Sequence, residues 1–226
     1  MKKVLIPILL LVLNVSGFAA TVNQVIRDYV VLSGASVTYE LCDTVDLDAS
    51  ILLFSASVNL TNPAEVLIAG RFTDNQNLEF RRNDIGASAV IYFQIVEFSS
   101  GVVVEHGSTN VNATTTNQTI NSITTSQAFA ITSMYNNGGT YGSDDGYTAA
   151  ITSSTNLQFV CNTSGFDVYW QVVEYADCSV QQVASTLTGT SSTGTISTAV
   201  DLTKTMLLRL IVSVGMSMPT ICLGQN

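Results

Sequence analysis

The sequence predicts an all-β protein: two tandem antiparallel β-sandwich repeats of about 77 residues with partial terminal copies, after a cleaved signal peptide. Three observations carry this prediction. The chain opens with two lysines and a short apolar segment. Similar phrases recur about 77 residues apart. Runs rich in Val, Ile, Thr, Tyr and Phe, bounded by Gly, Asn, Asp and Ser, fill the rest, as is typical of β-strands.

The opening stretch, MKKVLIPILLLVLNVSGFAA, has the layout of a secretory signal peptide. Two lysines precede an apolar run, and Gly17 and Ala19 occupy the −3 and −1 positions of a cleavage site. The alternative is a membrane anchor, but the run is shorter than the roughly 20 residues that span a bilayer. We therefore expect residues 1–19 to be removed. The mature protein would then be secreted or held at the cell surface by bacterial export, without stable membrane insertion.

The charge of the chain limits its partners. Without the two leader lysines, six basic and 17 acidic residues remain, a net charge of −11. Phosphate binding needs clustered Lys and Arg, so no nucleic-acid partner is expected. Charged residues make up only 11% of the chain, so we expect Ser, Thr and Asn to form most of its polar faces.

Internal similarity defines the repeat. The phrase Tyr92–Phe98 (YFQIVEF) matches Tyr169–Tyr175 (YWQVVEY) at four of seven positions. Upstream of both phrases, an N-L-x-F motif also recurs, and the segments Asp46–Leu53, Ser122–Phe129 and Asp201–Leu208 resemble one another. Two full copies fit, with a partial copy at each end, and incomplete end copies usually complete or cap their neighbours.

The two copies show matching strand patterns. We expect strands at 50–58, 65–73, 77–82, 88–98 and 101–106, and at 126–134, 147–153, 156–161, 167–175 and 179–187. A short helix is expected near 22–30. The predicted domains are a signal peptide at 1–19, a first sandwich at 20–121 and a second sandwich at 122–226.

The repeated phrase is apolar on both faces. In Ala89–Phe98 the two alternating sets of side chains are both largely hydrophobic, as in a strand that is buried on both sides. We expect a central strand whose second face is covered by a loop, by a neighbouring copy or by another subunit.

All four cysteines lie in the mature region. An even count in an exported chain suggests disulfides, and free thiols are the alternative. The pairing stays open among Cys42, Cys161, Cys178 and Cys222. No C-x-x-C spacing is present, so neither a metal site nor a cofactor is predicted.

The Gly-rich insertion at 135–147 is the predicted place for ligand binding, because loops on a rigid sandwich carry recognition. Its tyrosines could stack on a sugar or a partner, and its aspartates could bind Ca²⁺ through oxygen atoms, although the calcium-loop spacing is missing. The candidate binding residues are Tyr135, Tyr141, Asp144, Asp145 and Tyr147.

Catalysis is not predicted. Glu97 and Glu174 occupy the same register of the repeat, but glycosidases need two carboxylates that face one cleft. We expect each glutamate to bind the backbone of a neighbouring loop. His106 has no G-x-S-x-G partner motif and no counterpart in the second copy.

The second copy resembles a tandem β-repeat of large, uncharacterised exported bacterial proteins. The matching residues are the S-x-x-N-L-x-F pattern that ends at Phe159, V-x-W-Q-V-V-E-Y at Val168–Tyr175, and the D-x-x-K-T segment at Asp201–Thr205. The first copy departs from this pattern, with Phe93 in place of the tryptophan. The resemblance implies a repeat architecture and a surface location, without an assigned activity.

These observations favour a non-enzymatic, secreted or cell-surface structural or adhesive protein. It would be a subunit of an extracellular assembly, and its partners would be further copies of itself or other surface proteins. The alternative is a carbohydrate-binding module that binds glycans through the 135–147 loop.

Overall fold

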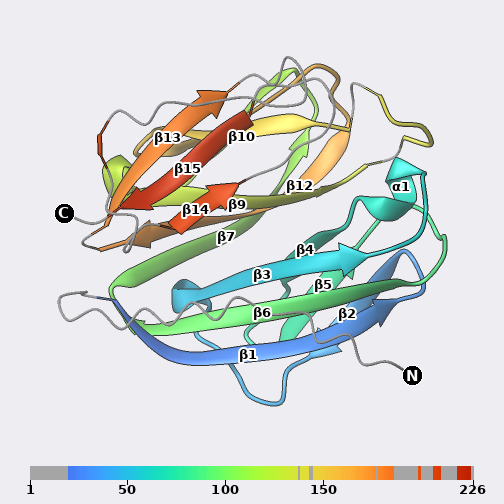
Figure 1. The fold of residues 1–226 in the computed structure, drawn as a ribbon, viewed down its shortest axis with the longest axis horizontal. Coiled ribbons are helices and arrows are strands. Elements are labelled where there is room, and N and C mark those ends of the chain that lie inside the picture. The colour runs from blue at the N-terminus through green and yellow to red at the C-terminus, as the bar shows by residue number, and fades with distance from the viewer. Residues whose placement is uncertain are drawn as a thin grey trace.

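β-Strands dominate the chain in the computed structural model (Figure 1). The structure describes residues 20–136, 138–142, 145–176, 178–185, 198–199, 206–209 and 218–224. Within these residues the strands form antiparallel sheets of three strands each. The all-β, antiparallel prediction is therefore confirmed. The predicted signal peptide, residues 1–19, lies outside the described residues.

The first six strands form two sheets around one core. They are β1 (Thr21–Leu32), β2 (Ser36–Glu40), β3 (Ser50–Ser57), β4 (Ala69–Phe72), β5 (Asn77–Arg81) and β6 (Ala89–Ser100). The sheet orders are β1-β6-β3 and β2-β5-β4. Leu78 and Phe80 of β5 pack with Ile91, Phe93 and Ile95 of β6 in a shared hydrophobic cluster. We call these six strands the N-terminal sandwich.

The next six strands have the same arrangement. They are β7 (Val102–Val111), β8 (Thr115–Thr119), β9 (Ala128–Tyr135), β10 (Tyr147–Ser153), β11 (Asn156–Cys161) and β12 (Phe166–Tyr175). Their sheets, β7-β12-β9 and β8-β11-β10, repeat the strand order of the N-terminal sandwich. Leu157 and Phe159 of β11 pack with Val168 and Trp170 of β12. We call these strands the second sandwich.

A further sheet follows in the sequence. Its strands are β13 (Ser179–Ser185), β14 (Met206–Arg209) and β15 (Met218–Gly224), in the order β13-β15-β14. We call it the C-terminal sheet. Figure 1 shows it beside the second sandwich in the upper half of the molecule, with the N-terminal sandwich below.

The strand pairing places residues 102–119 with the second sandwich. β7 pairs with β12, and β8 pairs with β11. The sequence predicts these residues in the first sandwich, and the predicted boundary between residues 121 and 122 falls between β8 and β9.

Two local predictions are wrong. Residues 22–30 form part of strand β1 and not a helix, because β1 pairs with β6 along its whole length. The strand expected at 65–73 begins only at Ala69, because a helical turn, α1 (Pro63–Val66), comes first. Asn62 caps that turn by accepting a hydrogen bond from the N–H of Ala64 at 3.0 Å, and Pro63 occupies a position that favours helix initiation.

No helix among the described residues has the length and apolar character that crossing a membrane would require.

Gly107 makes room for the single tryptophan. It lies directly opposite Trp170 across the β7–β12 pair, and a Cβ atom placed on it would lie 2.1 Å from the indole ring. The indole N–H of Trp170 donates a hydrogen bond to Thr109 Oγ1 at 2.9 Å. A hydrogen bond and a packed core therefore hold the ring in the space that a methyl group would need.

We expect Gly107→Ala to lower the free energy of unfolding by about 1–3 kcal/mol, the usual cost of overpacking a core. Circular dichroism during urea unfolding would measure the change in every variant, including those without the single tryptophan. Gly139→Ala is the matched control, because nothing lies within 4 Å of its added Cβ. In a Trp170→Phe background the cost of Gly107→Ala should shrink, and an undiminished cost there would contradict this explanation.

Candidate functional site

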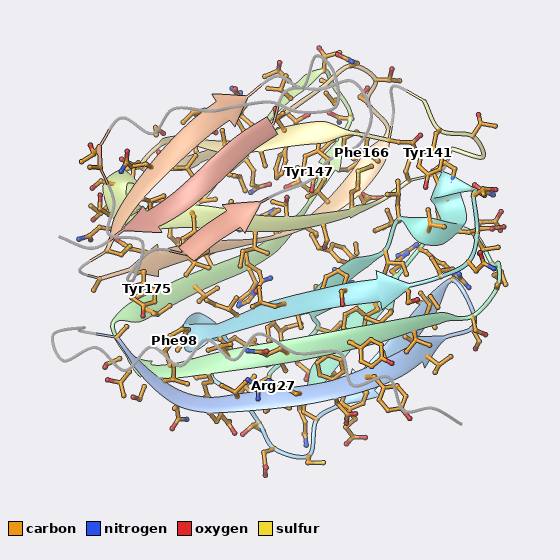
Figure 2. The ribbon with its side chains drawn as sticks, in the orientation of Figure 1. Arg27, Phe98, Tyr141, Tyr147, Phe166 and Tyr175 are labelled. Atoms are coloured by element: carbon orange, nitrogen blue, oxygen red, sulfur yellow. The ribbon has the colours of Figure 1, made fainter. Side chains whose placement is uncertain are left out.

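The 135–147 segment buries two of its three tyrosines. Tyr135 and Tyr147 are buried, whereas Tyr141 is 53% exposed. Tyr147 donates a hydrogen bond to Thr132 Oγ1 at 2.8 Å and packs against Phe166, with ring centroids 5.5 Å apart. Figure 2 shows Tyr141 at the margin of the molecule, while Tyr147 and Phe166 point into it. The predicted sugar stacking therefore depends on the Tyr141 ring.

Asp145 is buried within the same segment. Its Oδ1 atom accepts a hydrogen bond from Asn136 Nδ2 at 2.7 Å, and its Oδ2 atom accepts one from the N–H of Gly142 at 2.6 Å. Asp145 and Tyr147 also line a cavity of about 310 Å³. Both carboxylate oxygens thus hold the loop together. Asp144, the other predicted ligand, lies outside the described residues.

The two equivalent glutamates bind equivalent backbone groups. Glu97 accepts a hydrogen bond from the N–H of Asp46 at 3.2 Å, just before the 3₁₀ turn η1 (Leu47–Ala49). Glu174 accepts one from the N–H of Thr124 at 2.9 Å, just before the turn η2 (Thr125–Gln127). Each carboxylate therefore fixes the turn that leads into β3 or β9, which is the role the sequence predicts for it.

A groove of about 760 Å³ brings His106 and Glu174 together, along with Asp48 and Glu105. His106 Nε2 lies 3.0 Å from the carbonyl oxygen of Leu47, to which it donates a hydrogen bond. Glu105 accepts a hydrogen bond from the N–H of Asn121 at 2.7 Å. Glu97 is not one of the residues that line this groove. Side chains in this groove thus link turns to strands.

His106 makes the stability of the fold depend on pH. Burial lowers the pKa of His106 below its ordinary value of 6.5, against the opposing effects of backbone hydrogen bonds to Leu47 and Ser50 and the charge of Asp48. The unfolded chain therefore takes up the proton first as pH falls. The full contribution of neutral His106 is present above about pH 6.5, and it is lost progressively as pH falls toward the lower pKa of the folded state.

We expect the free energy of unfolding to decrease between pH 7 and pH 5, and this decrease to be smaller in a His106→Gln variant. Urea unfolding at several pH values would measure both slopes. The pKa values of Asp28 and Asp74 lie below their ordinary value of 3.8 because of hydrogen bonds, so these groups titrate outside this window. An identical pH dependence in the variant would contradict the role of His106.

The disulfide prediction gains no support from the described residues. Cys42 is exposed on the N-terminal sandwich, while Cys161 is buried in the core of the second sandwich. Burial raises the pKa of the Cys161 thiol. The sulfur of Cys178 lies 3.5 Å from the carbonyl oxygen of Gln127. The side chain of Cys222 is outside the described part of the chain.

Within the described residues, no three His, Cys, Asp or Glu side chains gather into a group that could hold a metal ion.

Polar side chains join the two sandwiches across their contact. Gln171, on the outward face of β12, binds the backbone of the edge strand β3. The N–H of Leu52 donates to Gln171 Oε1 at 2.7 Å, and Gln171 Nε2 donates to the carbonyl oxygen of Leu52 at 2.8 Å. Both residues are buried. One side-chain amide therefore satisfies both backbone groups of a strand edge.

Tyr169 extends this interface to the second sheet of the N-terminal sandwich. Its hydroxyl donates to Glu79 Oε2 at 3.2 Å. Arg71 lies over the Tyr169 ring, 4.5 Å from its centroid, and forms an ion pair with Glu79 at 2.8 Å. The N–H of Gly70 donates to Ser133 Oγ at 3.2 Å. The outward face of the β7-β12-β9 sheet thus covers the edges formed by β3 and β4.

An apolar cluster completes the contact. Ile51 and Phe98 of the N-terminal sandwich pack with Val104, Phe129 and Val173 of the second sandwich. Figure 2 shows Phe98 and Tyr175 close together at this end of the molecule, with ring centroids 5.8 Å apart. The contact therefore has a buried apolar part and buried polar pairs, as in a stable interface between proteins.

Most of the corresponding face of the N-terminal sandwich is exposed, and only its end at Ile51 packs against the second sandwich. Tyr92 matches Tyr169 in the repeat, but Tyr92 is 45% exposed and Tyr169 is 4% exposed. Tyr29 lies beside Tyr92, with ring centroids 6.0 Å apart. We call this outward side of the β1-β6-β3 sheet the open face, and its exposed apolar residues are Val25, Tyr29, Val31, Leu53 and Tyr92.

Sequence reasoning missed the specific partners in these contacts. The signal for them was present in part, because Gln94 and Gln171 share a register and the 89–98 segment is apolar on both faces. Those patterns predict a covered face. They do not say that a strand edge covers it.

Comparisons with protein-family models, with curated proteins and with solved structures find no match to this chain.

Proposed function

We propose that this chain is a non-enzymatic structural protein of the bacterial cell exterior, a subunit that associates with further copies of itself or with other surface proteins. The observation that carries the proposal is the recurring strand order of the two sandwiches. It supports a tandem repeat of about 77 residues, with the C-terminal sheet as an incomplete third copy. Such repeats stack through interfaces between neighbours.

The contact between neighbouring units also supports this proposal. Between the N-terminal and second sandwiches, β12 contacts β4 and β7 contacts η1. Between the second sandwich and the C-terminal sheet, the equivalent strands β15 and β13 contact β10 and η2. A docking mode that recurs along one chain is suited to recur between chains. The predicted signal peptide supports export of the mature protein.

Sedimentation velocity and negative-stain microscopy of the purified mature protein, starting at Ala20, test this proposal. We expect particles that grow with protein concentration. Monomers at every concentration, up to the highest that stays soluble, would contradict the proposed self-association.

A further inference from the structure

We infer that the open face of one chain docks onto the edge strand β14 of a second copy, so that the chains join head to tail. This inference rests on the proposed function, because it names the partner and the surface for self-association. The template for the contact is the buried interface between the two sandwiches of a single chain.

The open face carries the same kinds of residue as the covered face of the second sandwich. Gln94 and Gln171 have the same position in their units. Gln94 lies directly opposite Arg27 on β1, and Gln171 lies directly opposite His106 on β7. Val25 corresponds in the same way to Val104, yet Val25 is 37% exposed and Val104 is 2% exposed. The two faces therefore differ mainly in whether a neighbouring unit covers them.

Gln94 is placed to bind a strand edge. In the described structure its Oε1 atom accepts a hydrogen bond from Arg27 Nε at 3.1 Å, at an exposed position. Gln171, its counterpart, uses the same amide group to bind the N–H and carbonyl of Leu52. Exchanging one exposed hydrogen bond for two backbone hydrogen bonds at a buried edge is favourable, because water no longer competes for them.

The chemistry of the open face matches an interface. Aromatic side chains and Arg are enriched where proteins bind one another, and Lys, Glu and Asp are depleted there. Its exposed apolar residues lie on three neighbouring strands around the Arg27–Gln94 pair: Val25 and Tyr29 on β1, Tyr92 on β6 and Leu53 on β3. Exposed apolar residues gathered on one face of a sheet favour a binding surface.

The edge strand β14 is the matching partner surface. β14 is the edge strand of the C-terminal sheet, as β3 and β9 are edge strands of the equivalent sheets in the two sandwiches. Among the described residues, β15 is the strand that pairs with β14. The β7-β12-β9 sheet of the second sandwich contacts β3 and β4 of the N-terminal sandwich. In the same way, β15 of the C-terminal sheet contacts β10 of the second sandwich. Among the described residues no unit precedes the sheet β1-β6-β3, and a second copy would supply the edge.

A head-to-tail contact joins two different surfaces. Each added chain therefore exposes a new copy of both, and assembly continues into a filament or closes into a ring. Two open faces that bound one another would instead stop at a dimer.

Tyr92→Glu in the mature chain tests the open face. Docking would strip water from the new carboxylate and would remove the Tyr92 ring from the contact, so self-association should weaken by at least about tenfold. Val160→Glu is the matched control, because Val160 also faces outward from a central strand, β11, and is 37% exposed. It should assemble like the wild type. Sedimentation velocity measures association, and circular dichroism checks that both variants are folded.

A mixing experiment tests the polarity of the contact. The Tyr92→Glu chain keeps its β14 edge, so it can bind the open face of a wild-type chain and end growth in that direction. Adding it to wild-type protein should shorten the assemblies. Wild-type particles that stop at dimers, with no effect of the added variant, would show face-to-face pairing and overturn the inference.

The two proposals fail in different ways. A wild-type mature chain that stays monomeric contradicts the self-association in the proposed function. Assemblies that form and are unaffected by Tyr92→Glu contradict the head-to-tail contact alone.

Discussion

Replacing Arg82 with methionine is expected to lower the free energy of unfolding by about 3–5 kcal/mol. The Arg82 side chain is fully buried in the N-terminal sandwich. Its guanidinium donates hydrogen bonds to five backbone carbonyls, at 2.8–3.5 Å: Leu32, Gly34, Glu65, Gly86 and Ala87. These acceptors come from the β1–β2 turn, α1 and the loop before β6, so one side chain joins three connecting segments.

The expected loss of unfolding free energy comes from the backbone carbonyls that would lose Arg82 as their hydrogen-bond donor. Methionine keeps most of the side-chain volume but donates no hydrogen bond, so several carbonyls would face an apolar group without a partner. Each buried polar group that loses its partner costs about 1–3 kcal/mol, although relaxation and water entry recover part of the sum.

The adjacent Arg81 is the matched control for this experiment. Its side chain is exposed and lies over the Tyr135 ring at 4.8 Å. Arg81→Met should cost no more than about 1 kcal/mol, the usual contribution of such a contact. Urea unfolding followed by circular dichroism measures both variants. Equal effects at the two positions would contradict the role assigned to the carbonyl contacts.

Gln171→Met is expected to lower the free energy of unfolding by about 2–4 kcal/mol. The substitution would leave the N–H and the carbonyl of Leu52 buried and without the amide that satisfies both. Methionine has a similar length and shape, so loss of packing contributes little. The contact between the two sandwiches should weaken more than the core of either one.

Gln94→Met provides the comparison, because Gln94 has the same position in the repeat but lies on the open face. We expect a change within about 0.5 kcal/mol, as is usual for exposed positions. Urea unfolding of both variants, under conditions where the protein is monomeric, gives the difference. If the two substitutions cost the same, the buried amide contact does not stabilise the interface as described.

Most strands could be predicted because their own residues decide them. The prediction for 77–82 corresponds to β5, where Leu78 and Phe80 face the core and alternate with Glu79 and Arg81. The alternation in β5 commits that segment to a sheet before its neighbours are known. The prediction for 88–98 corresponds to β6.

The state of β1 depends on a distant partner. Its sequence, TVNQVIRDYVVL, mixes apolar and polar residues without strict alternation, and most of its side chains are at least partly exposed. Its pairing with β6 supplies the hydrogen bonds that make it a strand. Tertiary contacts of this kind override local preference.

The candidate site was harder to predict than the fold. Tyr135 and Tyr147 lie in a Gly-rich stretch whose composition resembles that of an exposed loop, yet packing buries both rings. The contact of Gln171 with Leu52 joins residues 119 positions apart. It follows from how one sandwich sits on the other, and no local pattern encodes that placement.

The pairing of β1 with β6 has a consequence for how the chain folds. Leu32 pairs with Ala89 and Arg27 pairs with Gln94, so the first strand of the N-terminal sandwich must find its last. Contacts between residues so far apart in sequence slow folding, because a long loop must close first. During synthesis from the N-terminus, this sandwich cannot close until β6 has emerged. Until then, β1 lacks the strand that pairs with it, and the core that Leu32 shares with Ala89 and Ile91 stays open.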